Sequence, residues 1–372
     1  MISKVKQRHK REVSQADIAR MAGVDQSTVS YALKGGANVS PKTQQRILEI
    51  IRKVNYRPNA HARSLRVGRS ELIGVVTSPV SHLFQAHLVD HIASRLRDLG
   101  LQMILRSLYT DQEKNREQVM ELLDRRAAGV IVETTQPTLY REFPIILGQR
   151  IPLVIIGPML EGTPSVTSDR LNAGRMVAAH LLSLRRRRLA TLTLSSVPRD
   201  GGPRFDGFRS AASESDMDVF DLLVPEGWGN PSQPESLGAH PIELGYEAAR
   251  HLREQRPDVD AIFCVNDESA MGLVSGLRDL GVRVPQDVAV VGFDDVPHAR
   301  HAAVPLTTIR QPTDEYADVA VQMLKAQLEQ DPGFVPEAKM LRCELIVRAS
   351  TDPAWSASAD RVGTDRTAVG RA

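Results

Sequence analysis

The sequence predicts a small all-α helix-turn-helix head joined to a larger α/β body, with two lobes built on parallel sheets. Residues 14–54 contain short helical segments with apolar faces, separated by glycine-containing breaks. From residue 72 onward, apolar strand-like runs alternate with helical segments. The chain has 372 residues, which is more than one hydrophobic core usually holds, so we expect more than one domain.

The first helical segment begins at a capping signal. Ser14 precedes the segment and Asp17 follows three residues later, which is the pattern of a hydroxyl cap with a returning carboxylate. Gly23 breaks this helix, and a second helix is expected over residues 26–33, ended by Gly35-Gly36. Two short helices joined by a tight glycine-containing turn form a helix-turn-helix.

A third helix is expected to start at Ser40-Pro41, with the serine as cap and the proline in the first turn. Pro58 disfavours helical backbone at Arg57, so the helix is expected to end there. Its apolar residues recur at helical spacing and can cover the first two helices. These residues are Ile47, Leu48, Ile50, Ile51 and Val54.

Charge is distributed very unevenly along the chain. Residues 1–70 carry a net charge of +11 and the remaining residues −9. A cationic head on an acidic body indicates a polyanionic partner for the head, and argues against a helical bundle without a nucleic-acid role. Phosphate contacts carry no sequence information, so bases must be read at the start of the second helix, in the major groove. Gln26, Ser27 and Tyr31 face the right way for this.

The body is predicted to alternate strands and helices. Strands are expected at residues 72–77, 101–105, 130–133, 153–156, 189–194, 219–224, 261–265 and 288–291. Helices are expected at residues 84–100, 113–126, 171–184, 204–215, 242–256 and 268–280, the third of them capped by residues 166–169. This alternation predicts parallel sheets with helices on both faces. Ligands bind such sheets beyond the carboxyl ends of the strands.

Short motifs of the head resemble the DNA-binding head of the LacI/GalR family of bacterial repressors. They are Asp17-Ile18-Ala19, Ala22-Gly23-Val24, Ser27-Thr28-Val29-Ser30, Val39-Ser40, Tyr56-Arg57-Pro58-Asn59 and Ala62-Arg63-Ser64-Leu65. Three body segments also resemble the family: Val265-Asn266-Asp267, residues 285–295, and residues 305–312, which match its cross-over strand. The resemblance covers residues 14–353. It implies that the body has the fold of a type I periplasmic binding protein.

The resemblance implies a division of the chain. Residues 1–57 form the DNA-binding head, residues 58–70 a hinge helix and linker, and residues 71–353 the two-lobed effector-binding and dimerisation body. Residues 354–372 are expected to be a disordered tail. In the family the hinge helix folds on specific DNA, where Leu65 would enter the minor groove and Ala62 would face its twin. A plain linker is the alternative for this segment.

Two sets of site residues follow. The DNA-binding set is Ser14, Gln26, Ser27, Thr28, Tyr31, Asn59, Ala62 and Leu65. The effector-binding set is Phe84, Arg204, Trp228, Asn266 and Asp294. Aromatic faces combined with carboxylate, amide and guanidinium groups suit a sugar. Core packing is the alternative for Phe84 and Trp228, and Asp267 is either a helix cap or a ligand contact.

The sequence departs from the family pattern in places. Gly157-Pro158 stands where many members have an aspartate or another polar ligand-binding residue, so one expected polar contact is missing. Residues 229–240 look inserted and are rich in proline, glycine and serine, which favours a loop near the pocket mouth. Arg185 to Arg188 replaces a Gly-His-x-x stretch, and a solvated helix end is expected there.

The cellular compartment is judged from cysteines and apolar runs. Cys264 and Cys343 make no disulfide framework, and Cys264 lies in an apolar run typical of a buried thiol. The basic start has no apolar core behind it, and no apolar run is long enough to span a bilayer. We therefore expect a cytoplasmic, nucleoid-associated protein without a membrane partner.

Such a chain could belong to one of three classes of protein: a ligand-responsive repressor, a binding protein that transports or buffers its ligand, or an enzyme on the same fold. The basic head argues against transport, and the absence of G-x-S-x-G, P-loop, Cys-x-x-Cys and H-E-x-x-H motifs argues against catalysis. His87 and His91 lie one helical turn apart but lack further spaced metal ligands. We expect a repressor without cofactor or metal, acting as a homodimer on near-palindromic operator DNA under control of a carbohydrate effector.

Overall fold

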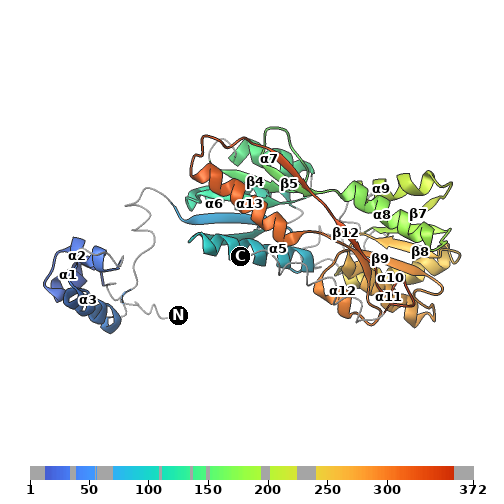
Figure 1. The fold of residues 1–372 in the computed structure, drawn as a ribbon, viewed down its shortest axis with the longest axis horizontal. Helices are drawn as coiled ribbons and strands as arrows, with labels where there is room; N and C mark the ends of the chain where they lie inside the picture. Colours follow the sequence, from blue (N-terminus) through green and yellow to red (C-terminus); the bar gives the residue numbers. More distant parts are fainter. Residues whose placement is uncertain are drawn as a thin grey trace, which may run out of the picture. The chain divides into compact units, whose positions relative to one another are not determined.

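A computed structural model describes residues 13–33, 39–54, 56, 70–108, 111–134, 137–147, 151–193, 202–223 and 240–355. The chain divides into two compact units, Met1–Ser70 and Glu71–Ala372. Figure 1 colours both units along the sequence. Each unit has its own hydrophobic core, and we describe them separately.

The first unit, the head, is a three-helix bundle. Its helices are α1 (Gln15–Ala22), α2 (Gln26–Leu33) and α3 (Pro41–Lys53). Ile18, Val29 and Ile47, one from each helix, are fully buried and form the centre of its core. The expected helix-turn-helix followed by a third covering helix is therefore present.

The third helix is shorter than predicted. Val54 is its C-cap, and the backbone N–H of Tyr56 turns back to the carbonyl of Ile51 at 3.0 Å. The chain thus leaves the helix at Lys53, before the restriction that Pro58 places on its neighbour can act. The prediction that this helix extends to Arg57 was wrong. The glycines expected to end α2 lie outside the described residues.

The first lobe of the body is built on a parallel sheet with strand order β11-β5-β4-β3-β1-β2. The strands are β1 (Leu72–Thr77), β2 (Gln102–Ser107), β3 (Gly129–Glu133), β4 (Leu153–Ile156), β5 (Ser165–Ser168) and β11 (Ala338–Leu341). Its helices are α5 (Leu83–Asp98), α6 (Gln112–Asp124), α7 (Pro137–Leu147) and α13 (Thr313–Leu328). Strands β3, β4 and β5 are buried along their whole length. Such burial is expected of a parallel sheet covered by helices on both faces.

The second lobe has the strand order β12-β10-β9-β8-β6-β7. The strands are β6 (Leu189–Thr193), β7 (Val219–Leu223), β8 (Ala261–Cys264), β9 (Ala289–Asp294), β10 (Thr307–Arg310) and β12 (Glu344–Ile346). Only β12 runs antiparallel to its neighbour among these described strands. The helices are α8 (Arg170–Ser183), α9 (Pro203–Ser213), α10 (Pro241–Gln255), α11 (Asp267–Asp279) and α12 (Pro297–His301).

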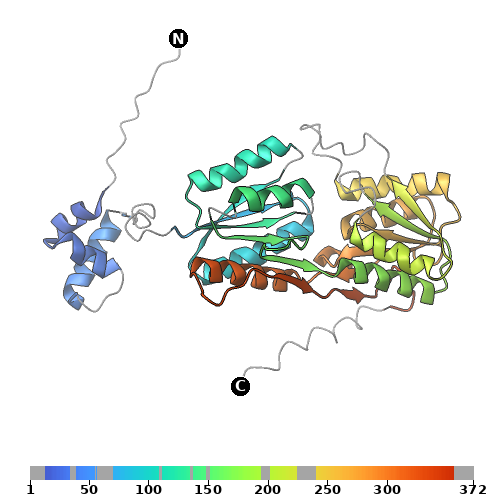
Figure 2. The same ribbon diagram turned by 90° about the horizontal axis from the view of Figure 1, so that it is seen from above.

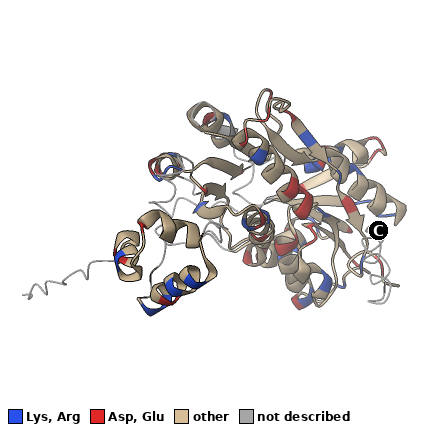
Figure 3. Ribbon diagram, turned by 60° about the vertical axis from the view of Figure 1, so that its left-hand side comes forward, with Lys and Arg blue, Asp and Glu red and all other residues tan. Residues whose placement is uncertain are grey.

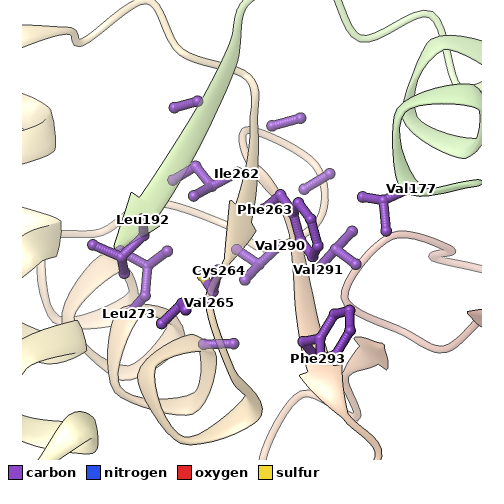
Figure 4. Close-up of a cluster of buried hydrophobic side chains, with 14 of the residues drawn as sticks. Val177, Leu192, Ile262, Phe263, Cys264, Val265, Leu273, Val290, Val291 and Phe293 are labelled. Atoms are coloured by element: carbon purple, nitrogen blue, oxygen red, sulfur yellow. The ribbon is translucent and has the colours of Figure 1, made fainter. Parts of the chain in front are cut away.

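The core of the second lobe is a single apolar cluster. Figure 4 shows Phe263, Val291 and Phe293 from β8 and β9 within it, and the Cys264 thiol lies in the same cluster. Cys264 is fully buried, and burial raises the pKa of its thiol well above the usual value. The expectation of a buried core thiol is confirmed.

The chain passes between the two lobes three times. Asp169 joins β5 to α8, Gln311-Pro312 joins β10 to α13, and Arg342-Cys343 joins β11 to β12. Figure 2 shows these connections running between the two sheets. The segment expected to return the chain to the first lobe contains β10, which belongs to the second sheet, and the return follows directly after it.

Some elements were not predicted. Residues 166–169 were expected only to cap a helix, but Ser165–Ser168 is the buried strand β5. Asp169 alone supplies the cap, because its carboxylate accepts a hydrogen bond from the backbone N–H of Asn172 at 3.0 Å. The helices α7, α12 and α13 and the strands β11 and β12 were also missed.

Candidate functional site

The start of α1 is held by the reciprocal cap that the sequence predicts. The Ser14 hydroxyl donates a hydrogen bond to the Asp17 carboxylate at 2.6 Å, and this carboxylate also accepts from the Ser14 backbone N–H at 2.9 Å. The Asp17 N–H donates to the Ser14 hydroxyl at 3.2 Å. Ser14 is exposed, so contact with a phosphate is possible only alongside its role as a cap.

Helix α2 presents a polar surface on one side and a buried side on the other. Val29 and Ala32 are buried, whereas Gln26 and Ser27 are exposed and Tyr31 is 49% exposed. Thr28 is half-buried. The three side chains predicted to read bases therefore point away from the core, as a helix that enters the major groove requires.

Basic side chains are exposed on the other two helices of the head. They are exposed on α1 and α3, at Arg20, Lys42, Arg46, Arg52 and Lys53. Figure 3 colours the basic and acidic residues of these helices. Guanidinium and ammonium groups on the same small domain as exposed polar side chains combine phosphate neutralisation with base contacts. The predicted site residues Asn59, Ala62, Leu65 and Trp228 lie outside the described residues.

Arg204 stands in the first turn of α9, where close helix packing places it. A side chain at Gly174 of α8 would overlap the carbonyl oxygen of Arg204, so the glycine allows the two helices to touch. The Arg204 guanidinium donates to the carbonyl oxygen of Val265 at the end of β8. Its central carbon lies 4.0 Å from the ring centroid of Phe293. These contacts hold the guanidinium beside the carboxyl ends of β8 and β9.

The charge of Arg204 is only partly balanced. Burial lowers the pKa of its guanidinium to about 10, and the nearby positive charge of Arg170 acts in the same direction. The negative charge of Asp294 acts in the opposite direction. A guanidinium in such surroundings is well suited to hold a ligand oxygen.

Asp294 ends β9 in a backbone conformation that is rare for residues other than glycine. Its φ is 120°, and that of Asp295 is 55°. The Asp294 carboxylate accepts a hydrogen bond from Nε2 of Gln311 at 2.7 Å. Burial raises the pKa of Asp294 to about 7, although the positive charge of Arg204 and the hydrogen bond from Gln311 lower it.

Asp295 anchors this turn through two ion pairs. Its carboxylate pairs with the guanidinium of Arg348 at 2.7 Å and with that of Arg310 at 2.7 Å. Arg348 is 2% exposed. A buried, doubly paired carboxylate directly after Asp294 holds the backbone in its positive-φ conformation, because rotating the turn would separate these charges.

Asn266 and Asp267 have structural roles that the sequence left open. The Asn266 side chain caps α11 and accepts from the backbone N–H of Ser269 at 2.9 Å. Asp267 is fully buried and accepts from the Thr308 hydroxyl at 2.5 Å and from the N–H of Val296 at 2.9 Å. Asn266, and not Asp267, is therefore the cap of α11, so the helix-cap expectation for Asp267 was wrong, while a ligand contact stays a prediction. Burial raises its pKa well above the usual carboxyl value, and repulsion from Asp294 adds to this.

Phe84 lies in the first turn of α5 and is 7% exposed. It packs into the apolar cluster of the first lobe together with Leu88 and Tyr316. This burial favours the alternative of core packing for Phe84. Contact with an effector through the remaining exposed edge stays a prediction.

A steric restriction accounts for the glycine at residue 157, where many family members have a polar residue. Gly157 follows β4 and packs against the chain that leaves β3. A Cβ atom at this position would overlap the carbonyl oxygen of Thr134. In this chain the close approach of these two loops excludes an aspartate at residue 157.

The stretch Arg185 to Arg188 forms hydrogen bonds with other segments of the second lobe. Arg186 donates to the carbonyl oxygen of Gln286 at 3.5 Å, and the backbone N–H groups of Arg187 and Arg188 donate to the Asp260 carboxylate at 3.0–3.1 Å. The expectation of a merely solvated helix end was therefore incomplete.

Two residues that make contacts between distant segments of the body were not predicted from the sequence. Gln311 bridges Asp294 to the Ser168 hydroxyl, which donates to its Oε1 at 3.1 Å. Glu268 is 3% exposed and accepts from the N–H of Leu83 in the other lobe at 3.3 Å. The Gln311–Ser168 and Glu268–Leu83 hydrogen bonds join residues 143 and 185 positions apart, so no local sequence pattern indicates either.

Comparison with known proteins agrees with this geometry. Residues 8–59 match the model of the bacterial regulatory proteins of the lacI family, and residues 178–351 match the periplasmic binding protein-like domain. The chain is 28% identical over 338 residues to the HTH-type transcriptional repressor PurR of Haemophilus influenzae (strain PittEE), covering 90% of this chain and 97% of the relative.

The chain belongs to the LacI family of bacterial regulatory proteins.

Solved structures of LacI-family proteins share its fold. One is the complex of the transcriptional regulator CelR with cellobiose, with a TM-score of 0.64 and 26% identity over 91% of this chain and 100% of that chain. Another is the Lac repressor dimer bound to operator and the anti-inducer ONPF, with a TM-score of 0.78 and 22% identity over 92% and 99% of the two chains. The latter likeness supports the two-lobed body and the helix-turn-helix head as a fold.

This LacI-family chain is therefore a DNA-binding transcriptional regulator with a ligand-binding type of body, and it is not an enzyme. Within the described part of the chain, no group of three or more His, Cys, Asp or Glu side chains is arranged to hold a metal ion. None of the helices that the structure describes combines the length and apolar character needed to cross a bilayer.

Proposed function

We propose that the protein is a transcriptional repressor whose affinity for operator DNA is set by a small molecule bound between the two lobes, and that this effector is a sugar or sugar derivative. The observation that carries the proposal is the placement of Arg204 and Asp294 at the carboxyl ends of neighbouring strands β8 and β9. One group donates hydrogen bonds and the other accepts them. Together they match the paired oxygen atoms of a sugar ring.

The effector class has support from a relative. The CelR structure, 26% identical to this chain, is titled as a complex with cellobiose. The relatives named PurR favour a purine base as the second candidate, at 28% identity over nearly the whole chain. Asn266 adds little discrimination between the two, because its side-chain oxygen already caps α11.

On the DNA side, we propose that Gln26, Ser27 and Tyr31 read bases and that Ser14, the cap of α1, and Thr28 of α2 add further contacts to the DNA. One helix-turn-helix contacts too few base pairs to select a genomic site, so the protein is proposed to act as a homodimer on a near-palindrome. Residues 58–70 would form the hinge helix between the head, residues 1–57, and the body, residues 71–353. Asn59, Ala62 and Leu65 would then contact DNA or the partner's hinge helix. The site of action would be the cytoplasmic nucleoid.

A thermal-shift screen of the full chain tests the effector class. The panel contains cellobiose, ribose and other sugars together with adenine, guanine and hypoxanthine. We expect a sugar to raise the melting temperature of the wild type and to lose this effect in Asp294→Asn, while Asp279→Asn, an exposed carboxylate change on α11, responds like the wild type. Stabilisation by a purine base alone would replace the sugar proposal. Equal stabilisation of wild type and Asp294→Asn would place the pocket elsewhere.

A further inference from the structure

A buried carboxylate connects the two lobes at the start of α5. Glu268 is the second residue of α11, belongs to the second lobe and is 3% exposed. Its Oε2 accepts a hydrogen bond from the backbone N–H of Leu83, the first residue of α5 in the first lobe, at 3.3 Å. The hydrogen bond joins residues 185 positions apart in the sequence.

Helix α5 lacks a cap from its own sequence. The N–H groups in the first turn of any α-helix have no partner within the helix, and a serine, threonine, aspartate or asparagine usually supplies one. His82 holds the N-cap position of α5 and makes no side-chain cap hydrogen bond. The Glu268 carboxylate takes that place from the other lobe. Its negative charge is also favourable at the positive end of the helix dipole.

Two imidazoles flank the carboxylate, one from each lobe. Nδ1 of His82 lies 3.6 Å from Oε2 of Glu268, and Nε2 of His240 lies 3.2 Å from Oε1. The two rings are stacked with centroids 6.3 Å apart. The imidazole side chains are 33% and 39% exposed, whereas the carboxylate side chain is 4% exposed. The cluster thus has a buried anion at its base and polar rings at its rim.

The tautomer of His240 fits this arrangement. His240 caps α10, where its Nδ1 accepts from the backbone N–H of Ile242 at 3.4 Å. A neutral imidazole that accepts at Nδ1 carries its proton on Nε2, the atom that faces Glu268. The 3.2 Å contact lies outside hydrogen-bond geometry, so Oε1 has no hydrogen bond within the described residues. The carboxylate therefore depends on the Leu83 N–H for its direct cross-lobe bond.

The same carboxylate influences both lobes. The α5 turn that it caps carries Phe84. On the side of the second lobe, burial is the main cause of the raised pKa of Asp294, and the negative charge of Glu268 adds to it. Glu268 thus touches the first lobe through the start of α5 and acts electrostatically on the proposed effector-binding carboxylate.

We propose that Glu268 is a positioning residue of the effector cleft, which caps α5 across the cleft and thereby sets the arrangement in which the two lobes close. Its relevance to effector sensing rests on the proposed function. The cross-lobe cap itself does not, because it is made by the protein alone. Opening of the lobes requires that this hydrogen bond break and that the start of α5 lose its cap.

Hydrogen exchange of the full chain tests the proposal. Glu268→Met keeps the length of the side chain but removes the acceptor, while Glu268→Gln keeps one carbonyl oxygen as an acceptor. Glu243→Met, an exposed first-turn position of α10, is the matched control. We expect the Leu83 amide to exchange roughly fivefold to tenfold faster in Glu268→Met, and much closer to the wild-type rate in Glu268→Gln and Glu243→Met.

Two results of the exchange experiment would contradict the proposal. An unchanged Leu83 exchange rate in Glu268→Met would mean that the cross-lobe cap does not hold α5. Faster exchange throughout the core strands β8 and β9 would make Glu268 a residue of general stability. Operator binding by the wild type is measured in a separate experiment. If the proposed function is wrong, the wild type will not bind operator DNA, but the exchange rate of the Leu83 amide will still test the cross-lobe hydrogen bond.

Discussion

The Asp294 carboxylate accepts a hydrogen bond from Nε2 of Gln311 at 2.7 Å. Gln311 stands where the chain leaves the second lobe for the first, and its Oε1 accepts from the hydroxyl of Ser168 at another crossing. A ligand that draws the Asp294 carboxylate toward itself therefore disturbs a buried network shared by two of the three connections. Under the proposed function, this network would couple effector binding at Asp294 to movement of the lobes.

The first prediction concerns how strongly the effector changes operator binding. Asp294→Asn and Arg204→Met should leave operator binding intact and weaken the effector's influence by roughly 1.5–3 kcal/mol, because each removes a charged hydrogen-bond partner. The measurement is operator binding titrated with the effector identified in the thermal-shift screen. Asp279→Asn serves as the control. Unchanged midpoints in both cleft variants would show these residues to be structural only.

Base reading by the head gives a second prediction. Gln26→Ala should weaken binding to the operator by about 1–3 kcal/mol relative to random DNA, whereas Lys42→Ala should weaken both by similar amounts. The reason is that an exposed amide can contact a base edge, while an ammonium group on α3 neutralises phosphate. Fluorescence anisotropy with both duplexes separates the two effects. An equal loss on both duplexes for Gln26→Ala would remove it from the base-reading set.

The pH dependence of stability gives a third prediction. Asp294 has a folded-state pKa of about 7, raised by burial from 3.8. A carboxyl with a raised pKa contributes stability that is fully present below its unfolded value and is lost as pH rises through its folded value. Between pH about 4 and about 7, wild-type stability should thus fall relative to Asp294→Asn. We expect roughly 1–2 kcal/mol, because the partly accessible side chain is screened by solvent.

Urea unfolding of both proteins at several pH values measures this difference. The free energy of unfolding of Asp294→Asn should rise relative to that of the wild type as pH rises toward 8. A constant difference across the range would mean that Asp294 titrates as an ordinary carboxyl. Asp279→Asn controls for the general effect of removing one negative charge.

A fourth prediction concerns Gly157. A Cβ atom there would overlap the Thr134 carbonyl oxygen, so Gly157→Ala should destabilise the body by about 1–3 kcal/mol through forced separation of two loops. At Gly333 an added Cβ meets only a side-chain oxygen of Asp331 at 3.4 Å, and Gly333→Ala should be nearly neutral. Thermal unfolding compares the two. Equal melting temperatures would contradict the steric account of this departure from the family.

Local patterns predicted the regular elements well and the long-range contacts poorly. The expected strand at residues 153–156 coincides with β4, because an uninterrupted apolar run is buried on both faces. Strand β5 was missed because Ser165 and Ser168 are polar, and their burial depends on a crossing segment far along the chain. A sequence pattern carries no information on such pairings.

The candidate site likewise contains residues that local patterns predicted and residues that they did not. Exposure of Gln26, Ser27 and Tyr31 followed from helical periodicity alone. The cap formed by Asn266 is local, because its partner Ser269 lies three residues further along the chain. The hydrogen bond between Asp267 and Thr308 of β10, in contrast, is a tertiary contact that no local pattern predicts. Glu268 could not be recognised at all, because its partner Leu83 belongs to the other lobe.

Selection of random-sequence duplexes by the full-length protein tests the central claim most directly. We expect the wild type to enrich a near-palindromic sequence, and Gln26→Ala to show relaxed preference at matching positions of both half-sites. Enrichment of no sequence, or of one without two-fold symmetry, would contradict a dimeric operator-binding repressor.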